Sequence, residues 1–303
     1  MSGTDDLLVG IDVGGTSVKL GLVDASGTRH GEASVPIESG ADARAIFGAT
    51  LERARELLGH PPDALGIGLP GLLDRDAGTI ENSPNLPWIL GFDVRGLFAE
   101  LGGIRRERIV LENDANVAAL GEIWLGAGRG AASAVLVTLG TGIGGGIVLD
   151  GALFVGEGLA GEIGHVTVDP DGLPCGCGSR GCLETLASAT AARRRAQEAG
   201  LTPDLETLAD RARAADGPER ELLFAIGRDL GHGCGSALCL FDLRTFVFGG
   251  GFSAALDVLE PGIRRGLSEW AYGDRVAAVR IERARLGPSA GWIGAARLLA
   301  SLP

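Results

Sequence analysis

The sequence lacks several features that define other classes of protein. No apolar run reaches the roughly 18 residues that a bilayer-spanning helix needs, so we expect no membrane segment. There is no basic run, and 27 basic against 39 acidic residues give a net charge of −12, which argues against binding to nucleic acid or to an anionic membrane. The acidic N-terminus, MSGTDDLLVG, leads directly into an apolar strand and does not resemble a signal peptide.

Two common nucleotide-binding motifs are also missing. The chain has neither a Walker lysine pattern nor a strand-to-helix G-x-G-x-x-G sequence. Glycine is abundant instead, with 51 of 303 residues gathered in short runs between apolar segments. Such runs form tight backbone turns, often at ligand sites. The length and the 45% apolar content predict a globular protein of two domains with sizeable cores.

Cysteine is scarce, yet three of the five cysteines lie within eight residues of one another. They belong to segment 160–184, AGEIGHVTVDPDGLPCGCGSRGCLE, whose candidate metal ligands are His165, Cys175, Cys177 and Cys182. Three thiolates and one imidazole suit a tetrahedral, structural Zn²⁺. The alternative is buried cysteines or a disulfide, although a Cys-x-Cys pair spaces its thiols poorly for bridging each other. Clustered reduced cysteines without a secretion signal favour the cytoplasm.

Two acidic residues, Glu162 and Glu184, flank this cysteine segment. We expect the metal to fold a loop whose flanking acids face a polar ligand.

A glycine turn follows the first strand. The apolar run 7–12 ends at Asp12-Val13-Gly14-Gly15-Thr16, and a second strand covers 17–24, so the pattern predicts a hairpin. Backbone N–H groups in such a turn can bind phosphate, and Asp12 can hold Mg²⁺ through water. An ordinary hairpin explains the same pattern, because Gly-Gly turns are common.

The same layout occurs again after a strand at 133–138, which indicates an internal duplication. This second turn contains Gly140, Thr141 and Gly142, and two such turns facing each other would bind a polyphosphate from both sides. A third glycine run, Gly249, Gly250 and Gly251, ends a strand at 245–248 and opens a helix. A nucleotide base or ribose can lie over such flat backbone, although close helix packing is an equal alternative.

Polar residues stand at two further strand ends. A strand at 108–111 stops at Glu-Asn-Asp-Ala-Asn before a helix at 115–125, which places Asn113 and Asp114 at a strand-to-helix junction, where site residues gather in α/β folds. Helix capping explains one of the two equally well. A strand at 64–69 ends at Pro70-Gly71, and the loop beyond it, which contains Asn85, either lines a site or forms a plain surface turn.

The alternation of strands and helices predicts an α/β fold with two domains. The small domain would comprise 1–112 plus 289–303, and the large domain, with the zinc loop, 113–288. The remaining predicted elements are strands at 29–35 and 276–281 and helices at 41–58, 92–101, 185–199, 205–214, 221–240 and 288–299.

Together the glycine turns, E-N-D-A-N, G-E-I-G-H and C-G-C-G-S-R-G-C-L-E resemble the ROK family (repressors, open reading frames, kinases) of sugar kinases. The resemblance covers essentially the whole chain, with the motifs in family order, and is greatest to bacterial ATP-dependent glucokinases. It implies an actin-like ATPase fold, with two ribonuclease-H-like α/β domains around a cleft, and a homodimer or homotetramer. Only about six residues precede the first strand, which leaves no room for the DNA-binding segment of the family's repressors.

The resemblance also assigns roles to individual residues. It implies that Asp114 is the catalytic base and that the other sugar contacts are Gly71, Asn85, Asn113, Glu162, His165 and Glu184. It implies that Asp12, Gly14, Gly15 and Thr16 form the first phosphate motif, that Gly140, Thr141 and Gly142 form the second, and that Gly249, Gly250 and Gly251 bind adenosine. It implies that His165, Cys175, Cys177 and Cys182 hold structural zinc.

The activity that the resemblance implies is transfer of a phosphoryl group from MgATP to the 6-hydroxyl of glucose. The alternatives are a kinase for mannose, fructose, N-acetylmannosamine or a cyclitol, polyphosphate as the donor, and a sugar sensor without activity.

Overall fold

The structure is a computed structural model that describes residues 7–38, 40, 42–82 and 86–302. The chain divides into two compact units. Unit 1 comprises Met1–Gly130, Val155–Gly158 and Pro288–Pro303, and unit 2 comprises Ala131–Phe154 and Leu159–Gly287. The sequence analysis placed the border near residue 113, whereas helix α3 (Asp114–Trp124) falls in unit 1 because it packs against α10 (Ala290–Leu298).

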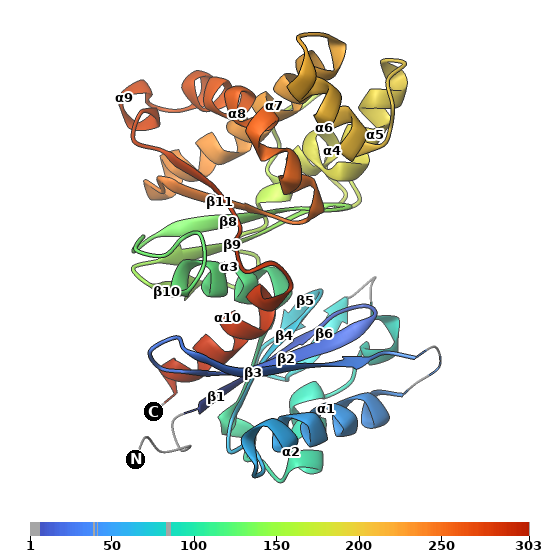
Figure 1. Ribbon diagram of the computed structural model, residues 1–303, viewed down its shortest axis with the longest axis vertical. Helices are drawn as coiled ribbons and strands as arrows, with labels where there is room; N and C mark the ends of the chain where they lie inside the picture. The colour runs from blue at the N-terminus through green and yellow to red at the C-terminus, as the bar shows by residue number, and fades with distance from the viewer. Residues whose placement is uncertain (1–6, 39, 41, 83–85, 303) are drawn as a thin grey trace. The chain divides into compact units, whose positions relative to one another are not determined.

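Unit 1 is built on a five-stranded sheet in the order β3-β2-β1-β4-β7, in which β1, β4 and β7 are parallel. Helices α1 and α2 cover one face of this sheet, and α3 and α10 cover the other (Figure 1). The strands are β1 (Leu7–Val13), β2 (Ser17–Asp24), β3 (Arg29–Pro36), β4 (Leu65–Leu69) and β7 (Ile109–Asn113), with a separate hairpin of β5 (Leu72–Asp74) and β6 (Thr79–Asn82). The helices are α1 (Ala43–Leu58) and α2 (Val94–Gly102), with 3₁₀ helices η2 (Pro87–Ile89), η3 (Arg106–Arg108), η6 (Gly287–Ser289) and η7 (Leu299–Ser301).

Glycines in β1 and β4 let the backbone of α10 lie directly on the sheet. A Cβ atom added at Gly10 would lie 1.8 Å from the carbonyl oxygen of Trp292, and one added at Gly66 would lie 1.8 Å from that of Ala295. No side chain fits into these contacts. The C-terminal helix is therefore held in one position on strands from the beginning of the chain.

Unit 2 repeats this topology with a sheet in the order β10-β9-β8-β11-β12, as the two glycine hairpins predict. Helices α4 to α8 lie together on one face of the sheet (Figure 1). The strands are β8 (Ala134–Leu139), β9 (Ile143–Leu149), β10 (Ala152–Phe154), β11 (Thr245–Gly249) and β12 (Arg280–Arg283). The helices are α4 (Leu183–Ala187), α5 (Ala189–Glu198), α6 (Leu205–Ala214), α7 (Pro218–Phe241), α8 (Leu256–Trp270) and α9 (Gly273–Val276), with 3₁₀ helices η4 (Ile163–His165) and η5 (Gly251–Ala255).

Two elements differ from the sequence analysis. The helix predicted at 185–199 is broken at Ser188, whose side chain caps α5 by accepting the N–H of Ala191 at 3.1 Å. The last strand, predicted at 276–281, is present but begins four residues later, because Val276 ends α9 and β12 begins at Arg280. The buried Val279 lies in the connection between them, so it is apolar because it packs in the core and not because it belongs to a strand.

No helix in the described part of the chain has the length and apolarity needed to cross a bilayer.

The contact between α10 and the sheet predicts the effect of a single methyl group. The substitution Gly66→Ala forces α10 away from β4. The free energy of unfolding, measured by urea titration, should therefore fall by about 1–3 kcal/mol. Gly48→Ala is the matched control, because nothing lies within 4 Å of a Cβ atom at that position in α1. It should raise stability by up to about 1 kcal/mol through helix propensity. Equal stability of the Gly66 variant and the wild-type protein would contradict this packing.

Candidate functional site

The predicted site residues of unit 1 that the structure describes lie along the carboxyl edge of its parallel strands. Asp12 of β1 pairs with Gly68 of β4, and Gly68 pairs with Glu112 of β7, so the three form one row across the sheet. Neighbouring strands lie about 4.8 Å apart, so this row brings the ends of β1 and β7 within roughly 10 Å of each other. Asn113 ends β7 at the same edge, where ligands bind in α/β sheets.

Asp12 lies against the first turn of α10. A Cβ atom added at Gly291 would be 2.4 Å from the Asp12 carboxyl carbon, so a side chain there would displace the carboxylate. Burial raises the pKa of the Asp12 carboxyl from 3.8 to about 6, and the positive charge of Lys19 on the neighbouring strand offsets part of the rise. A bound cation would remove this penalty, and a carboxylate is a ligand that Mg²⁺ prefers.

The turn after β1 has the predicted hairpin form. The Gly14 N–H donates to the carbonyl oxygen of Ser17 at 3.0 Å, and the carbonyl oxygen of Thr16 accepts the Ile37 N–H at 2.9 Å. Gly15 and Thr16 are exposed at the tip. The turn therefore presents backbone and one hydroxyl to a ligand from a fixed position.

Asn113 is the N-cap of α3 and Asp114 is its first residue, so the capping interpretation of the pair is confirmed for Asn113. The Asn113 side-chain oxygen caps the helix by accepting the N–H groups of Ala115 at 2.9 Å and Asn116 at 3.2 Å, while its amide nitrogen donates to the Gly71 carbonyl at 3.1 Å. This second bond joins the Pro-Gly turn after β4 to the end of β7. Asp114 is the first residue of the helix, where the helix dipole favours a negative charge.

Sequence reasoning missed the ion pair that supports this junction. Arg75, in the β5–β6 hairpin, binds the buried Glu112 carboxylate with two nitrogens. Glu112 also accepts the Asn113 N–H at 2.8 Å and the Asn116 side-chain amide at 2.9 Å. An arginine in a turn-rich loop gives no sequence signal of its partner, which lies 37 residues further along the chain.

In unit 2 the second glycine turn joins β8 to β9. The Gly140 N–H donates to the carbonyl of Gly142 at 3.0 Å. The third glycine run packs against the end of β8, since a Cβ atom at Gly250 would lie 2.4 Å from the Leu139 carbonyl oxygen. Gly249 pairs with Thr138, so the two glycine segments lie side by side on neighbouring strands.

A pocket of about 600 Å³ opens beside these two segments. Its lining includes Gly140 and Thr141 of the turn and Gly251 of η5, together with residues of α5 and α6 that the sequence analysis did not identify. Sites for small molecules have this size, with apolar walls and a few polar groups. The newly identified polar residues are Arg193, Asp204, Glu206, Asp210 and Arg213.

The four predicted metal ligands come together in the loop before α4. Their ligand atoms all lie within 4.8 Å of one another, with Cys175 Sγ 3.5 Å from His165 Nδ1 and Cys177 Sγ 3.6 Å from Cys182 Sγ. In a tetrahedral zinc site with bonds of about 2.0–2.3 Å, neighbouring ligands lie roughly 3.5–3.8 Å apart. This donor set therefore fits a tetrahedral metal ion.

The two acids beside the cluster have different surroundings. Glu162 is exposed, and its carboxylate lies 3.9 Å from Nε2 of His165, the ring nitrogen that faces away from the cysteines. Glu184 is partly buried, and its Oε2 accepts the N–H of Ile143 at 2.8 Å. Glu184 thus contacts the second glycine turn, whereas the sequence analysis assigned it to the sugar alone.

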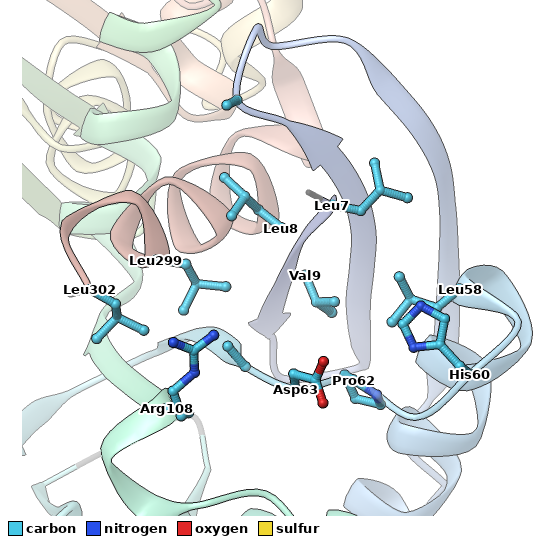
Figure 2. A pocket seen from close by; sticks show the side chains of 12 residues that line it. Leu7, Leu8, Val9, Leu58, His60, Pro62, Asp63, Arg108, Leu299 and Leu302 are labelled. Carbon is cyan, nitrogen blue, oxygen red and sulfur yellow. The ribbon is translucent and has the colours of Figure 1, made fainter. Parts of the chain in front are cut away.

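Two features lie outside this site. Asn85, a predicted sugar contact, is outside the described residues. A hollow of about 490 Å³ lies at the opposite, amino ends of β1, β4 and β7, where Asp63, Arg108 and Leu299 face it (Figure 2). None of the predicted site residues lines this hollow.

The topology and strand-end turns of the two units are those of the actin-like ATPase fold. The chain belongs to the ROK family, whose model matches residues 8–301.

Comparison with individual members shows the range of this family. A glucokinase of Halalkalibacterium halodurans is 36% identical, over 96% of this chain and 94% of its own. An N-acetyl-D-glucosamine kinase of Yersinia pseudotuberculosis is 31% identical, over 95% and 97%. A ROK family glucokinase from Streptomyces griseus, solved in complex with glucose and AMPPNP, has a TM-score of 0.72 and 34% identity over 96% of this chain and 98% of its own.

The raised pKa of Asp12 predicts how stability depends on pH without ligands. The folded protein binds this proton more tightly than the unfolded chain, so stability falls as pH rises from about 4 to about 6 and stays lower above that range. Asp12→Asn removes the buried charge and should raise the free energy of unfolding at pH 8 by about 1–3 kcal/mol. Urea titrations at pH 8 and pH 4 measure this.

At pH 4 the Asp12→Asn variant and the wild-type protein should be nearly equal in stability. Asp63→Asn, which changes an exposed carboxylate of the same unit, should leave the free energy of unfolding unchanged at both pH values. The same gain at both pH values would show that the effect of Asp12→Asn is unrelated to charge.

Proposed function

We propose that this protein transfers the γ-phosphoryl group of ATP to the 6-hydroxyl of glucose. The observation that carries the proposal is the position of Asp114, at the start of α3, on the same sheet edge as the first glycine turn. Phosphoryl transfer depends mainly on position and on charge neutralisation, which this combination of a fixed carboxylate and backbone turns supplies. The similarity to glucokinases over nearly the whole chain supports glucose as the acceptor.

Asp114 accepts the proton of the attacking hydroxyl. The side-chain oxygen of Asn113 caps α3, and one of its amide hydrogens is donated to the Gly71 carbonyl. Its second amide hydrogen can therefore be donated to a sugar oxygen. Glu162, His165 and Glu184 bind the remaining hydroxyls and fix the orientation of the ring. This orientation lowers the activation barrier for phosphoryl transfer by several kcal/mol.

The nucleotide occupies both glycine turns and the pocket of unit 2. MgATP, when bound, supplies the phosphoryl group and a cation that neutralises its charge. Gly14 to Thr16 and Gly140 to Gly142 offer backbone N–H groups to the phosphates, and Asp12 holds the cation through water. The pocket of about 600 Å³ beside Gly251 accommodates adenosine, which favours ATP over polyphosphate as the donor.

The metal held by His165, Cys175, Cys177 and Cys182 is structural zinc. His165 directs Nδ1 toward the cysteines, so Nε2 is left to face a sugar hydroxyl, with its tautomer set by the metal. None of the five cysteines forms a disulfide, which suits the reducing cytoplasm, where ATP is also available. We assign the assembly as a homodimer or homotetramer from the family resemblance.

The zinc assignment predicts metal content and stability. Cys182→Ser should reduce bound zinc to well below one ion per chain, measured by mass spectrometry, and lower the melting temperature, because a buried ligand is lost. Cys239→Ser, which changes an exposed cysteine outside the cluster, should keep one zinc ion and the wild-type melting temperature. Equal zinc content in the two variants would contradict the assignment.

The role of Asp114 predicts a specific loss of turnover. Asp114→Asn keeps the shape of the first helical residue but removes the proton acceptor, so kcat with glucose and MgATP should fall by about 10²–10⁴. The glucose Kd should change only a few-fold, because orientation comes from other residues. Asp274→Asn, at an exposed position of α9, is the control and should keep wild-type kcat. Near-normal turnover by the Asp114 variant would mean that another group is the base.

A further inference from the structure

The segment that follows the metal cluster contacts both ends of the second glycine turn. At one end, the Glu184 carboxylate accepts the Ile143 N–H at 2.8 Å. The same oxygen lies so close to Gly142 that a Cβ atom there would be 2.2 Å from it. At the other end, the Ala189 N–H donates to the Gly140 carbonyl at 2.9 Å. Helix α4 and the start of α5 therefore hold the turn from both sides.

The metal cluster fixes the start of this segment. Cys182, one of the four ligands, is the N-cap residue of α4, two positions before Glu184. Its carbonyl oxygen accepts the Thr185 N–H at 2.9 Å and the Thr185 hydroxyl at 2.7 Å. Leu183 donates its N–H to the Val166 carbonyl at 2.9 Å. A displacement of Cys182 therefore moves the backbone that carries Glu184.

The other side of the cluster also packs on the turn. His165 ends η4, and a Cβ atom at its neighbour Gly164 would lie 2.0 Å from the carbonyl oxygen of Ile143. Two of the chain segments that bring metal ligands, η4 with His165 and the start of α4 with Cys182, therefore both contact Ile143.

Backbone hydrogen bonds link the two arms of this loop, such as those from the Cys175 N–H to the Ser179 carbonyl and from the Gly181 N–H to the Leu173 carbonyl, both at 2.8 Å, but the loop has almost no apolar core. Its residues 169–180 are mostly exposed, and Cys175 is the buried side chain among them. A segment with so small an apolar core depends on its metal for a fixed conformation. Loss of the ion should then release the hold on Ile143.

We propose that Glu184 is a positioning residue for the nucleotide, through which the metal cluster sets the shape of the second phosphate turn and so the affinity for ATP. This inference rests on the proposed function, and it extends the role of the metal beyond the sugar side of the site. In the described part of the chain, Oε1 of Glu184 has no hydrogen-bond partner, so one carboxylate can hold the turn with Oε2 and a sugar hydroxyl with Oε1.

The test measures binding of a non-hydrolysable ATP analogue in Mg²⁺ buffer without sugar, by calorimetry. Glu184→Ala, with its zinc content verified, should weaken binding by about tenfold or more, because a charge-assisted hydrogen bond is lost. Wild-type protein stripped of zinc and returned to chelator-free buffer should show a similar loss. Stripping zinc from Glu184→Ala should add little, because the two changes act through the same contact.

Two further variants separate positioning from general effects. Glu184→Gln keeps an oxygen acceptor for Ile143 and should bind within about threefold of wild type. Asp171→Ala removes an exposed acid of the loop to which no binding role is assigned, and should leave analogue binding unchanged.

Unchanged binding by zinc-stripped wild-type protein, or by zinc-loaded Glu184→Ala, would overturn the inference. Tighter binding by Glu184→Ala would also overturn it, because the carboxylate would then act only by repelling phosphate. Failure of zinc-loaded wild-type protein to bind the analogue at all would overturn the proposed function and this inference together.

Discussion

Direct contact between the backbone of α10 and the strands β1 and β4 is the constraint on which unit 1 depends. It exists because Gly10 and Gly66 carry no side chain on that face. The same helix begins at Ala290, so its first turn reaches Asp12 through Gly291. The packing that positions the C-terminal helix thus also creates the buried environment of the carboxylate beside the first glycine turn.

The two units share one sheet topology but contribute different chemistry. Unit 1 has carboxylates near the ends of β1 and β7, and the Arg75–Glu112 pair and the Asn113 cap fix the backbone around Asp114. In unit 2 the strands β8 and β11 end at glycine segments, and a pocket opens beside them. Its metal loop then adds the polar side chains that its strands lack. A duplicated fold can in this way carry different functional groups at the same edge of its two sheets.

The sequence predicts the features that depend on local patterns. Buried strands ending in glycine or in Asn-Asp identified the turns and the start of α3, and cysteine spacing identified the metal cluster. The sequence did not predict contacts between residues far apart in the chain. Nothing near Arg75 indicates that it pairs with Glu112, and nothing in the Cys-Leu-Glu sequence indicates that Glu184 accepts a hydrogen bond from Ile143. The pocket residues of α5 and α6 were missed for the same reason, since an amphipathic helix does not show which polar residues line a cavity. The last strand was predicted to begin at 276 instead of 280, because apolar residues in a buried connection resemble those of a strand.

The most direct test of the central claim measures ADP release and identifies the product, using zinc-loaded protein, MgATP and single hexoses. The account predicts rapid ADP release with glucose, one phosphate ester per ADP, and the ester located at C6 by ³¹P–¹H NMR. Much weaker turnover is expected with N-acetylmannosamine and N-acetylglucosamine. Strong turnover with another sugar would retain the kinase mechanism and contradict the choice of glucose. Absence of ADP release with every sugar would contradict the account as a whole.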